Sequence, residues 1–251
     1  MSVVLAATWD PRGELERFQA VLPQLRGLYQ DVAIALPPQA EPACAALQER
    51  GTTAILSPDW SRGRYIALQK SVEISTASHV HYADLDRLLR WVEIRPQEWR
   101  QTVERLQQCD CLVIGRSPAA YATHPQALVQ TETISNAVVS SLLGQKMDVS
   151  AGSKGFSRRA VEFLLAHTSP GHALGTDAEW PLTLHRAGFQ VDYVEVDGLD
   201  WEIPDHFQAQ AAGSDRQRQV AAEYDADPRR WAHRVAVARE IVEVALQNSK
   251  I

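Results

Sequence analysis

The sequence predicts one α/β domain, a Rossmann-like, mostly parallel mixed sheet flanked by helices, followed by a C-terminal helical appendage. Short apolar runs rich in Val and Ile recur along the 251 residues, and longer amphipathic stretches separate them. A chain of this length in this class often forms one domain. The expected strands lie at 3–9, 31–36, 53–56, 80–83, 111–114 and 191–196.

Between these runs, apolar residues recur with the period of an α-helix. Apolar residues between the first two strands lie three or four positions apart, which predicts a helix ending near Gly27. Further helices are expected over 64–75, from Pro96, over 158–166 and over 179–186. The chain turns polar after Pro204, and a long helix follows Asp227. We therefore expect a catalytic domain over 1–210 and a helical extension over 211–251 packed on it.

Composition excludes several classes of protein. A net charge of −6 argues against a nucleic-acid binder, because phosphate affinity comes from clustered Lys and Arg. Basic residues gather only at Lys154, Arg158 and Arg159, and for the last two a solvated basic face is the alternative. No window has the roughly 18 to 20 apolar residues of a membrane span, so we expect no transmembrane segment and leave peripheral membrane contact open.

The cysteines indicate the compartment. The chain has three cysteines, an odd number: Cys44, Cys109 and Cys111. The Cys-x-Cys pair alone does not make a structural zinc site. Buried free thiols in a reducing compartment are the favoured interpretation. We therefore expect a cytoplasmic protein. Its oligomeric state stays open, with a homodimer as one alternative.

Two carboxylates follow the strand at 80–83. Asp84 and Asp86 lie where it ends, at the edge at which open α/β sheets bind ligands. Mn²⁺ and Mg²⁺ prefer such oxygen ligands and leave positions open for a diphosphate. Asp-x-Asp alone is a weak signal, because carboxylates also favour helix N-termini. The segment around it is more informative.

Residues 62–86 resemble the nucleotide-binding half of the A-type (GT-A fold) glycosyltransferases, most of all the family 2 enzymes. In that family a Gly-x-x-x-Ala helix, here Gly63 to Ala67, leads to a strand and then to Asp-x-Asp. The resemblance implies a GT-A fold with Mn²⁺ or Mg²⁺ on the two aspartates. It also implies a nucleotide-sugar site formed by Thr8, Asp10, Arg64, Asp84, Leu85 and Asp86.

A second block, 175–191, is similar to the family's Glu-Asp-x-Glu segment. The match implies that Asp177 is the catalytic base, with Glu179 as second choice. An N-cap is the equally weighted alternative for Asp177. Trp180 and Trp201 flank the expected pocket, but tryptophans at such spacing usually pack in the core.

Two further segments complete the implied site. Residues 148–160 are similar to the family's small-residue strand and loop, which implies that Gly152 and Lys154 lie near the donor phosphates. His206 follows the last strand, where some A-type enzymes have a third metal ligand. A lone surface histidine is the alternative for His206.

The predicted function is transfer of a hexose from a UDP- or GDP-linked sugar to a hydroxyl acceptor. Residues 7–11 and 36–38 depart from the family pattern for base recognition, so the sequence does not name the nucleotide. A non-catalytic nucleotide-sugar-binding or regulatory module is the main alternative. A nucleotidyltransferase is less favoured, because the first loop has a single glycine, Gly13.

Overall fold

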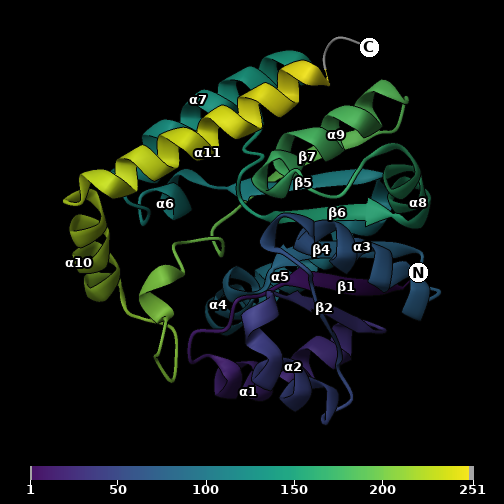
Figure 1. The fold of residues 1–251 in the computed structure, drawn as a ribbon, viewed down its shortest axis with the longest axis horizontal. Helices are drawn as coiled ribbons and strands as arrows, with labels where there is room; N and C mark the ends of the chain where they lie inside the picture. The colour runs from purple at the N-terminus through teal and green to yellow at the C-terminus, as the bar shows by residue number, and fades with distance from the viewer. Residues whose placement is uncertain (1, 249–251) are drawn as a thin grey trace.

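A seven-stranded sheet runs through the centre of the molecule, in the order β3-β2-β1-β4-β6-β5-β7 (Figure 1). The structure, a computed structural model, describes residues 2–248. The strands are β1 (Val3–Thr8), β2 (Val32–Leu36), β3 (Thr53–Leu56), β4 (His79–Asp84), β5 (Cys111–Arg116), β6 (Ser153–Ser157) and β7 (Val191–Val196).

The sheet is mixed but mostly parallel, which confirms the predicted fold class. Only β6 runs antiparallel to its neighbours, and it lies between β4 and β5. The other six strands share one direction, so their carboxyl ends meet at one edge. Because β6 runs the opposite way, its first residue, Ser153, pairs with Ala83 near the end of β4. The 152–154 loop and strand start thereby reach the edge that carries Asp84.

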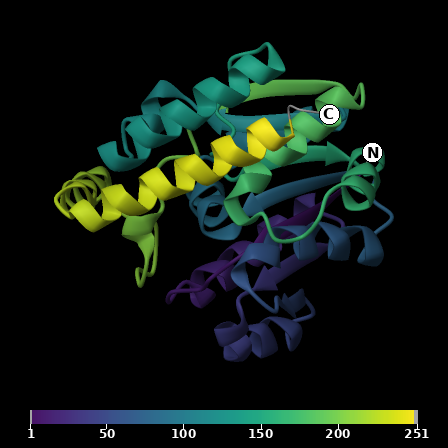
Figure 2. The ribbon, with the colours of Figure 1, turned by 45° about the horizontal axis from the view of Figure 1, so that its top comes forward.

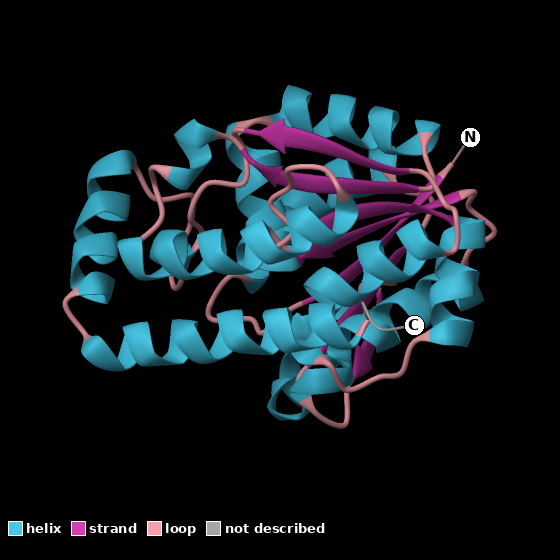
Figure 3. Ribbon diagram, turned by 90° about the horizontal axis from the view of Figure 1, so that it is seen from above, coloured by secondary structure: helices cyan, strands magenta, loops and turns pink. Residues whose placement is uncertain are grey.

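Helices cover both faces of the sheet (Figure 3). The expected helices are present, but Gly27 does not end the first one: α1 continues to Leu28 and the chain becomes extended at Tyr29. Gly27 has open space around it, so nothing forces a break there. The helices are α1 (Leu15–Leu28), α2 (Glu41–Gln48), α3 (Gly63–Ile74), α4 (Leu85–Ile94), α5 (Pro96–Arg105), α6 (Pro118–Tyr121), α7 (Gln126–Leu143), α8 (Arg158–His167), α9 (Thr176–Arg186), α10 (Ser214–Asp225) and α11 (Pro228–Gln247).

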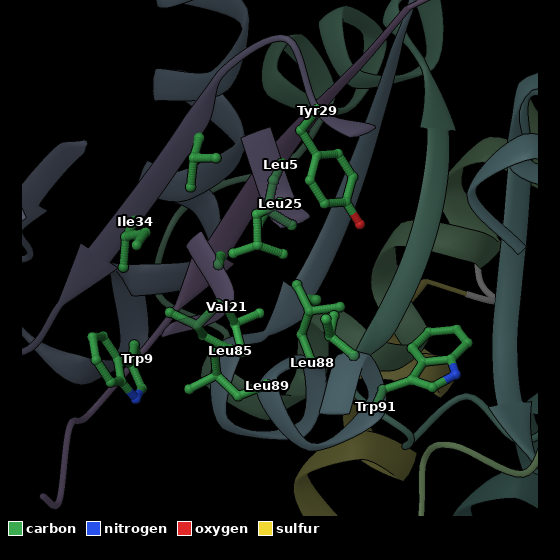
Figure 4. Packing of buried hydrophobic residues seen from close by; sticks show 14 of the residues in the cluster. Leu5, Trp9, Val21, Leu25, Tyr29, Ile34, Leu85, Leu88, Leu89 and Trp91 are labelled. Atoms are coloured by element: carbon green, nitrogen blue, oxygen red, sulfur yellow. The ribbon is translucent and has the colours of Figure 1, made fainter. Parts of the chain in front are cut away.

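Each face of the sheet has its own hydrophobic cluster. One cluster joins β1 and β2 to α1, α4 and α5, with Leu5, Leu25, Leu85 and Leu88 packed together (Figure 4). The other joins the opposite face to α3, α7, α8, α9 and α11. Burial of this apolar surface holds the strand ends, and thus the site residues on them, in fixed positions.

The C-terminal helix lies along α7 and also packs on α9 (Figures 1 and 2). Its start is capped by Asp227, whose side chain accepts a hydrogen bond from the Arg229 N–H. The division at residue 210 stays a prediction. No helix within residues 2–248 is both long and apolar enough to cross a membrane. The three cysteines are free and buried, as expected.

Candidate functional site

A cavity of about 510 Å³ opens at the carboxyl edge of the parallel strands. This volume lies within the range of small-molecule sites. Six of the residues predicted for the site line it: Thr8, Asp10, Arg64, Asp84, Asp86 and His206. The structure therefore brings together the end of β1, the start of α3 and the Asp84–Asp86 turn.

Asp84 ends β4 and is fixed by three side chains. The Tyr82 hydroxyl donates to its Oδ1 at 2.8 Å, and the Thr8 hydroxyl donates at 3.2 Å. The Arg64 guanidinium reaches its Oδ2 at 3.2 Å. These bonds orient the carboxylate at the cavity wall before any ligand arrives, which is the preorganisation that a binding site needs.

Gly152 lies against this carboxylate and accepts a hydrogen bond from the Asp84 N–H at 2.8 Å. Its φ of +69° is in the left-handed region that favours glycine. A Cβ at this position would overlap the Asp84 carboxylate and lie 2.8 Å from Cγ. Only glycine therefore allows the loop before β6 to approach Asp84 this closely.

Alanine at position 152 should displace the Asp84 carboxylate and weaken metal-dependent nucleotide binding by at least about tenfold, a loss of about 1.4 kcal/mol. Gly144 offers a matched control, because it has the same φ of +69° but nothing within 4 Å of a new Cβ. Both variants should lose about 1 kcal/mol of stability to backbone strain. Isothermal titration should show weakened binding in Gly152→Ala alone; equal binding in the two variants would contradict the role of the close approach.

Asp86, on the first turn of α4, lies in a group of carboxylates. Burial raises its pKa to about 8, and the neighbouring charges of Glu202 and Asp84 add to the shift. Arg87 offsets this in part, since its N–H donates to Asp86 at 2.9 Å while its guanidinium binds Glu202 at 3.3 Å. Glu202 Oε2 has no partner among residues 2–248. Arg64 and Arg87 offset part of the negative charge of Asp84, Asp86 and Glu202, and a divalent metal ion would offset more of it.

The fit to a metal is partial. Asp84 and Asp86 are suitable oxygen donors, but no three Asp, Glu, His or Cys side chains of the described chain are grouped as a metal site. His206 Nε2 lies 3.6 Å from Glu14 Oε1 instead. Sites for Mg²⁺ and Mn²⁺ commonly use one or two carboxylates and take the remaining ligands from phosphate and water. The two aspartates fit that pattern, and the metal role of His206 stays a prediction.

Asp177 is buried behind the cavity wall, in the first turn of α9. Its Oδ1 accepts hydrogen bonds from Arg64 at 2.8 Å and from Lys154 at 2.7 Å. Burial alone would raise its pKa, but these two cations outweigh it and the pKa is lowered. The carboxylate does not cap the helix, because α9 begins at Thr176 with Gly175 as its N-cap. Arg64 thus joins Asp177 to Asp84.

The remaining predicted residues lie outside the cavity lining. Lys154 is inside β6, 1% exposed, and donates to Val149 O as well as to Asp177. Glu179 binds His172 Nδ1 at 2.9 Å, and burial raises its pKa. The side chain of Leu85 packs in the core. Trp180 and Trp201 are buried in the core, which confirms the prediction of core packing for both.

Several cavity residues were not predicted from the sequence: Arg12, Trp60, Arg87, Glu202, His233 and Arg234. Arg87 directly follows Asp86, and this adjacency was the available signal. His233 and Arg234 come from α11, which the sequence presents only as an appendage. A narrow recess adjoins the cavity between the ends of β1 and β2, and Leu36, Ser57 and Leu174 are among its lining residues.

Comparison with known proteins supports the fold. No family model matches the chain, and no curated protein sequence matches it. Among solved structures, glucosyl-3-phosphoglycerate synthase from Mycobacterium tuberculosis aligns over 100% of this chain and 81% of its own, with TM-score 0.62 and 15% identity. The chain has the A-type glycosyltransferase fold.

Two further solved structures show the same fold. A mycobacterial protein aligns over 100% of this chain and 75% of its own, with TM-score 0.63 and 15% identity. A complex of the synthase with Mn²⁺, UDP-glucose and phosphoglyceric acid aligns over 100% and 80%, with TM-score 0.56 and 12% identity. At such identities the likeness concerns the fold. The cavity residues must therefore carry any argument about the function of this chain.

Proposed function

We propose that the protein transfers a hexose from a UDP- or GDP-linked sugar to a hydroxyl acceptor, using Mn²⁺ or Mg²⁺ held by Asp84 and Asp86. The observation that carries the proposal is the group of three carboxylates, Asp84, Asp86 and Glu202, in a cavity at the carboxyl edge of an A-type glycosyltransferase fold, where burial and the neighbouring charges raise the pKa of Asp86. The Mn²⁺ and UDP-glucose bound by the synthase of similar fold support it, and favour UDP over GDP.

The protein groups around the proposed metal have distinct tasks. A bound cation would offset the charge that develops on the leaving diphosphate. Tyr82, Thr8 and Arg64 keep the Asp84 carboxylate oriented toward the cavity. The recess lined by Leu36 and Leu174 is apolar enough to take one face of a nucleobase, although it must widen to admit the whole ring.

Asp177 remains our proposed base. Its lowered pKa keeps it ionised at neutral pH, as proton abstraction from a hydroxyl requires. Both cations bind Oδ1, and no residue of the described chain donates to Oδ2. Oδ2 is therefore the oxygen that would take the proton of the acceptor hydroxyl. Asp177 does not line the cavity, so contact with an acceptor requires the Arg64 side chain, which bonds both Asp177 and Asp84, to move.

The proposed metal site should depend on pH. With its pKa raised to about 8, the Asp86 carboxyl of the metal-free protein holds a proton at neutral pH that a cation must displace. Mn²⁺ affinity should therefore rise by up to about tenfold per pH unit between pH 6 and 8 and level off above. Calorimetric titration of Mn²⁺ at several pH values across this range measures the affinity. The slope should disappear in Asp86→Asn; a flat profile in the unmodified protein would contradict the assignment.

A thermal-shift panel separates the candidate functions. A ligand of the folded state raises the unfolding midpoint, so UDP or GDP with Mn²⁺ should raise it, and CDP should not. Release of free sugar, or transfer to a hydroxyl acceptor, would then establish turnover. Binding without either reaction would favour the non-catalytic module. If no diphosphate shifts the midpoint, the nucleotide-sugar assignment is wrong.

A further inference from the structure

The C-terminal helix contributes to the main cavity. His233 and Arg234 of α11 line the same cavity as Asp84 and Asp86, although almost 150 residues of chain separate them. The path of α11 along α7 brings its first half to the sheet edge (Figure 1). The segment that the sequence presents as an appendage is thus part of the wall around the proposed transfer site.

Arg234 forms one strong hydrogen bond, but another of its N–H groups has no partner among the described residues. Its Nη2 donates to Glu132 of α7, and its side chain is 13% exposed. Its Nε is buried and has no partner among residues 2–248. The other Glu132 oxygen already binds Arg116, so a single carboxylate serves two guanidinium groups. A buried N–H without a partner costs about 1–3 kcal/mol, and a rotation of the side chain that brings this N–H to a ligand acceptor in the cavity would remove that cost.

Three other arginines of the cavity differ from Arg234. Arg12, Arg64 and Arg87 each bind a carboxylate that itself lines the cavity, namely Asp10, Asp84 and Glu202 respectively. The partner of Arg234 does not line the cavity, and the exposed His233 makes no hydrogen bond to the described residues. Arg234 is therefore an arginine of the wall whose partner carboxylate lies outside the wall, and the exposed His233 lies next to it in the sequence.

We propose that His233 and Arg234 bind an anionic group, a phosphate or a carboxylate, on the acceptor. The inference rests on the proposed function, in which Asp84 and Asp86 hold the metal and the donor diphosphate and leave the α11 wall to the second substrate. A guanidinium is suited to this task because its N–H groups form strong charge-assisted bonds with phosphate and carboxylate oxygens. The anion would position the acceptor hydroxyl.

Binding of glycerol 3-phosphate, D-glycerate and glycerol, measured by calorimetry without nucleotide, tests the proposal. The unmodified protein should bind one of the two anionic probes more tightly than glycerol. Arg234→Gln should weaken that binding at least about tenfold, the loss expected for a hydrogen bond to a charged group. His233→Ala, which removes an exposed side chain without a bond to break, should weaken it in the same direction.

Arg239→Gln is the matched control, because it makes the same charge change on α11 at an exposed position outside the cavity lining. It should bind the anionic probe as the unmodified protein does. The proposal is wrong if neither anion binds better than glycerol, if Arg239→Gln loses as much as Arg234→Gln, or if Arg234→Gln weakens Mn²⁺-dependent UDP binding and leaves the probe unaffected. If the anion binds and depends on Arg234 but UDP does not bind, the proposed function fails while the anion site stands.

Discussion

Asparagine in place of Asp86 should reduce sugar transfer at least about 100-fold, because the amide cannot supply the negative charge that, in the proposed function, holds the cation against the leaving diphosphate. Folding should be unaffected. The raised pKa means that the metal-free folded state already favours the neutral carboxyl at pH 7, and asparagine resembles that form. The measurement is kcat/KM for donor consumption with saturating Mn²⁺, alongside the thermal midpoint of the metal-free protein.

Asp215→Asn provides the control for charge. Asp215 lies on α10 with a side chain 94% exposed, so the same substitution there should leave kcat/KM unchanged. The metal-free stability of Asp86→Asn should equal or exceed that of the unmodified protein at pH 8. Between about pH 4 and about pH 8 the folded state holds a proton on Asp86 that the unfolded chain has released, so the stability of the unmodified protein falls as the pH rises through that interval. Activity of Asp86→Asn within twofold of normal would remove Asp86 from the site.

Methionine in place of Arg116 should lower the free energy of unfolding by about 3–5 kcal/mol, the cost of removing one partner from a buried ion pair. Arg116 is completely buried at the end of β5. It donates to Asp148 at 2.8 Å and 2.9 Å, binds Glu132, and lies over the Tyr121 ring. The substitution leaves Asp148 and Glu132 without this charge. Denaturant unfolding measures the loss.

Arg159→Met is the comparison for this prediction. Arg159 also pairs with an aspartate, Asp110, but its side chain is 73% exposed. Water screens that pair, so its loss should cost no more than about 1 kcal/mol. Similar losses in the two variants would show that burial adds nothing to the Arg116 network. The network also holds Glu132, the partner of Arg234, so Arg116→Met should weaken binding of the anionic probe too.

The six parallel strands could be predicted from the sequence because apolar runs bounded by amphipathic stretches directly reflect buried parallel strands. The Asp84–Asp86 turn was predictable for the same reason, since a strand end fixes the edge at which its next residues lie. The antiparallel β6 contains no apolar run and was implied only by the family resemblance. Thr8 and Arg64 were placed by resemblance, and the structure brings both to Asp84.

Other features depend on contacts that periodicity does not reveal. Helix α7 was not predicted because it buries polar residues such as Glu132 and Asn136 beside its apolar ones, so it shows no clean apolar stripe. Lys154 was expected near the donor phosphates from the family resemblance and its positive charge, yet the structure buries it in an ion pair with Asp177. The arrival of His233 and Arg234 at the cavity depends on how α11 packs on α7, a long-range contact.

Calorimetric titration of UDP into the protein, with Mn²⁺ and with the metal chelated, tests the central claim most directly. The claim is that Asp84 and Asp86 join a divalent cation to a nucleotide diphosphate in the cavity at the sheet edge. UDP should bind at least about tenfold more tightly with Mn²⁺, and Asp86→Asn should lose that gain. Equal UDP affinity with and without the metal, or a gain that persists in Asp86→Asn, would contradict it.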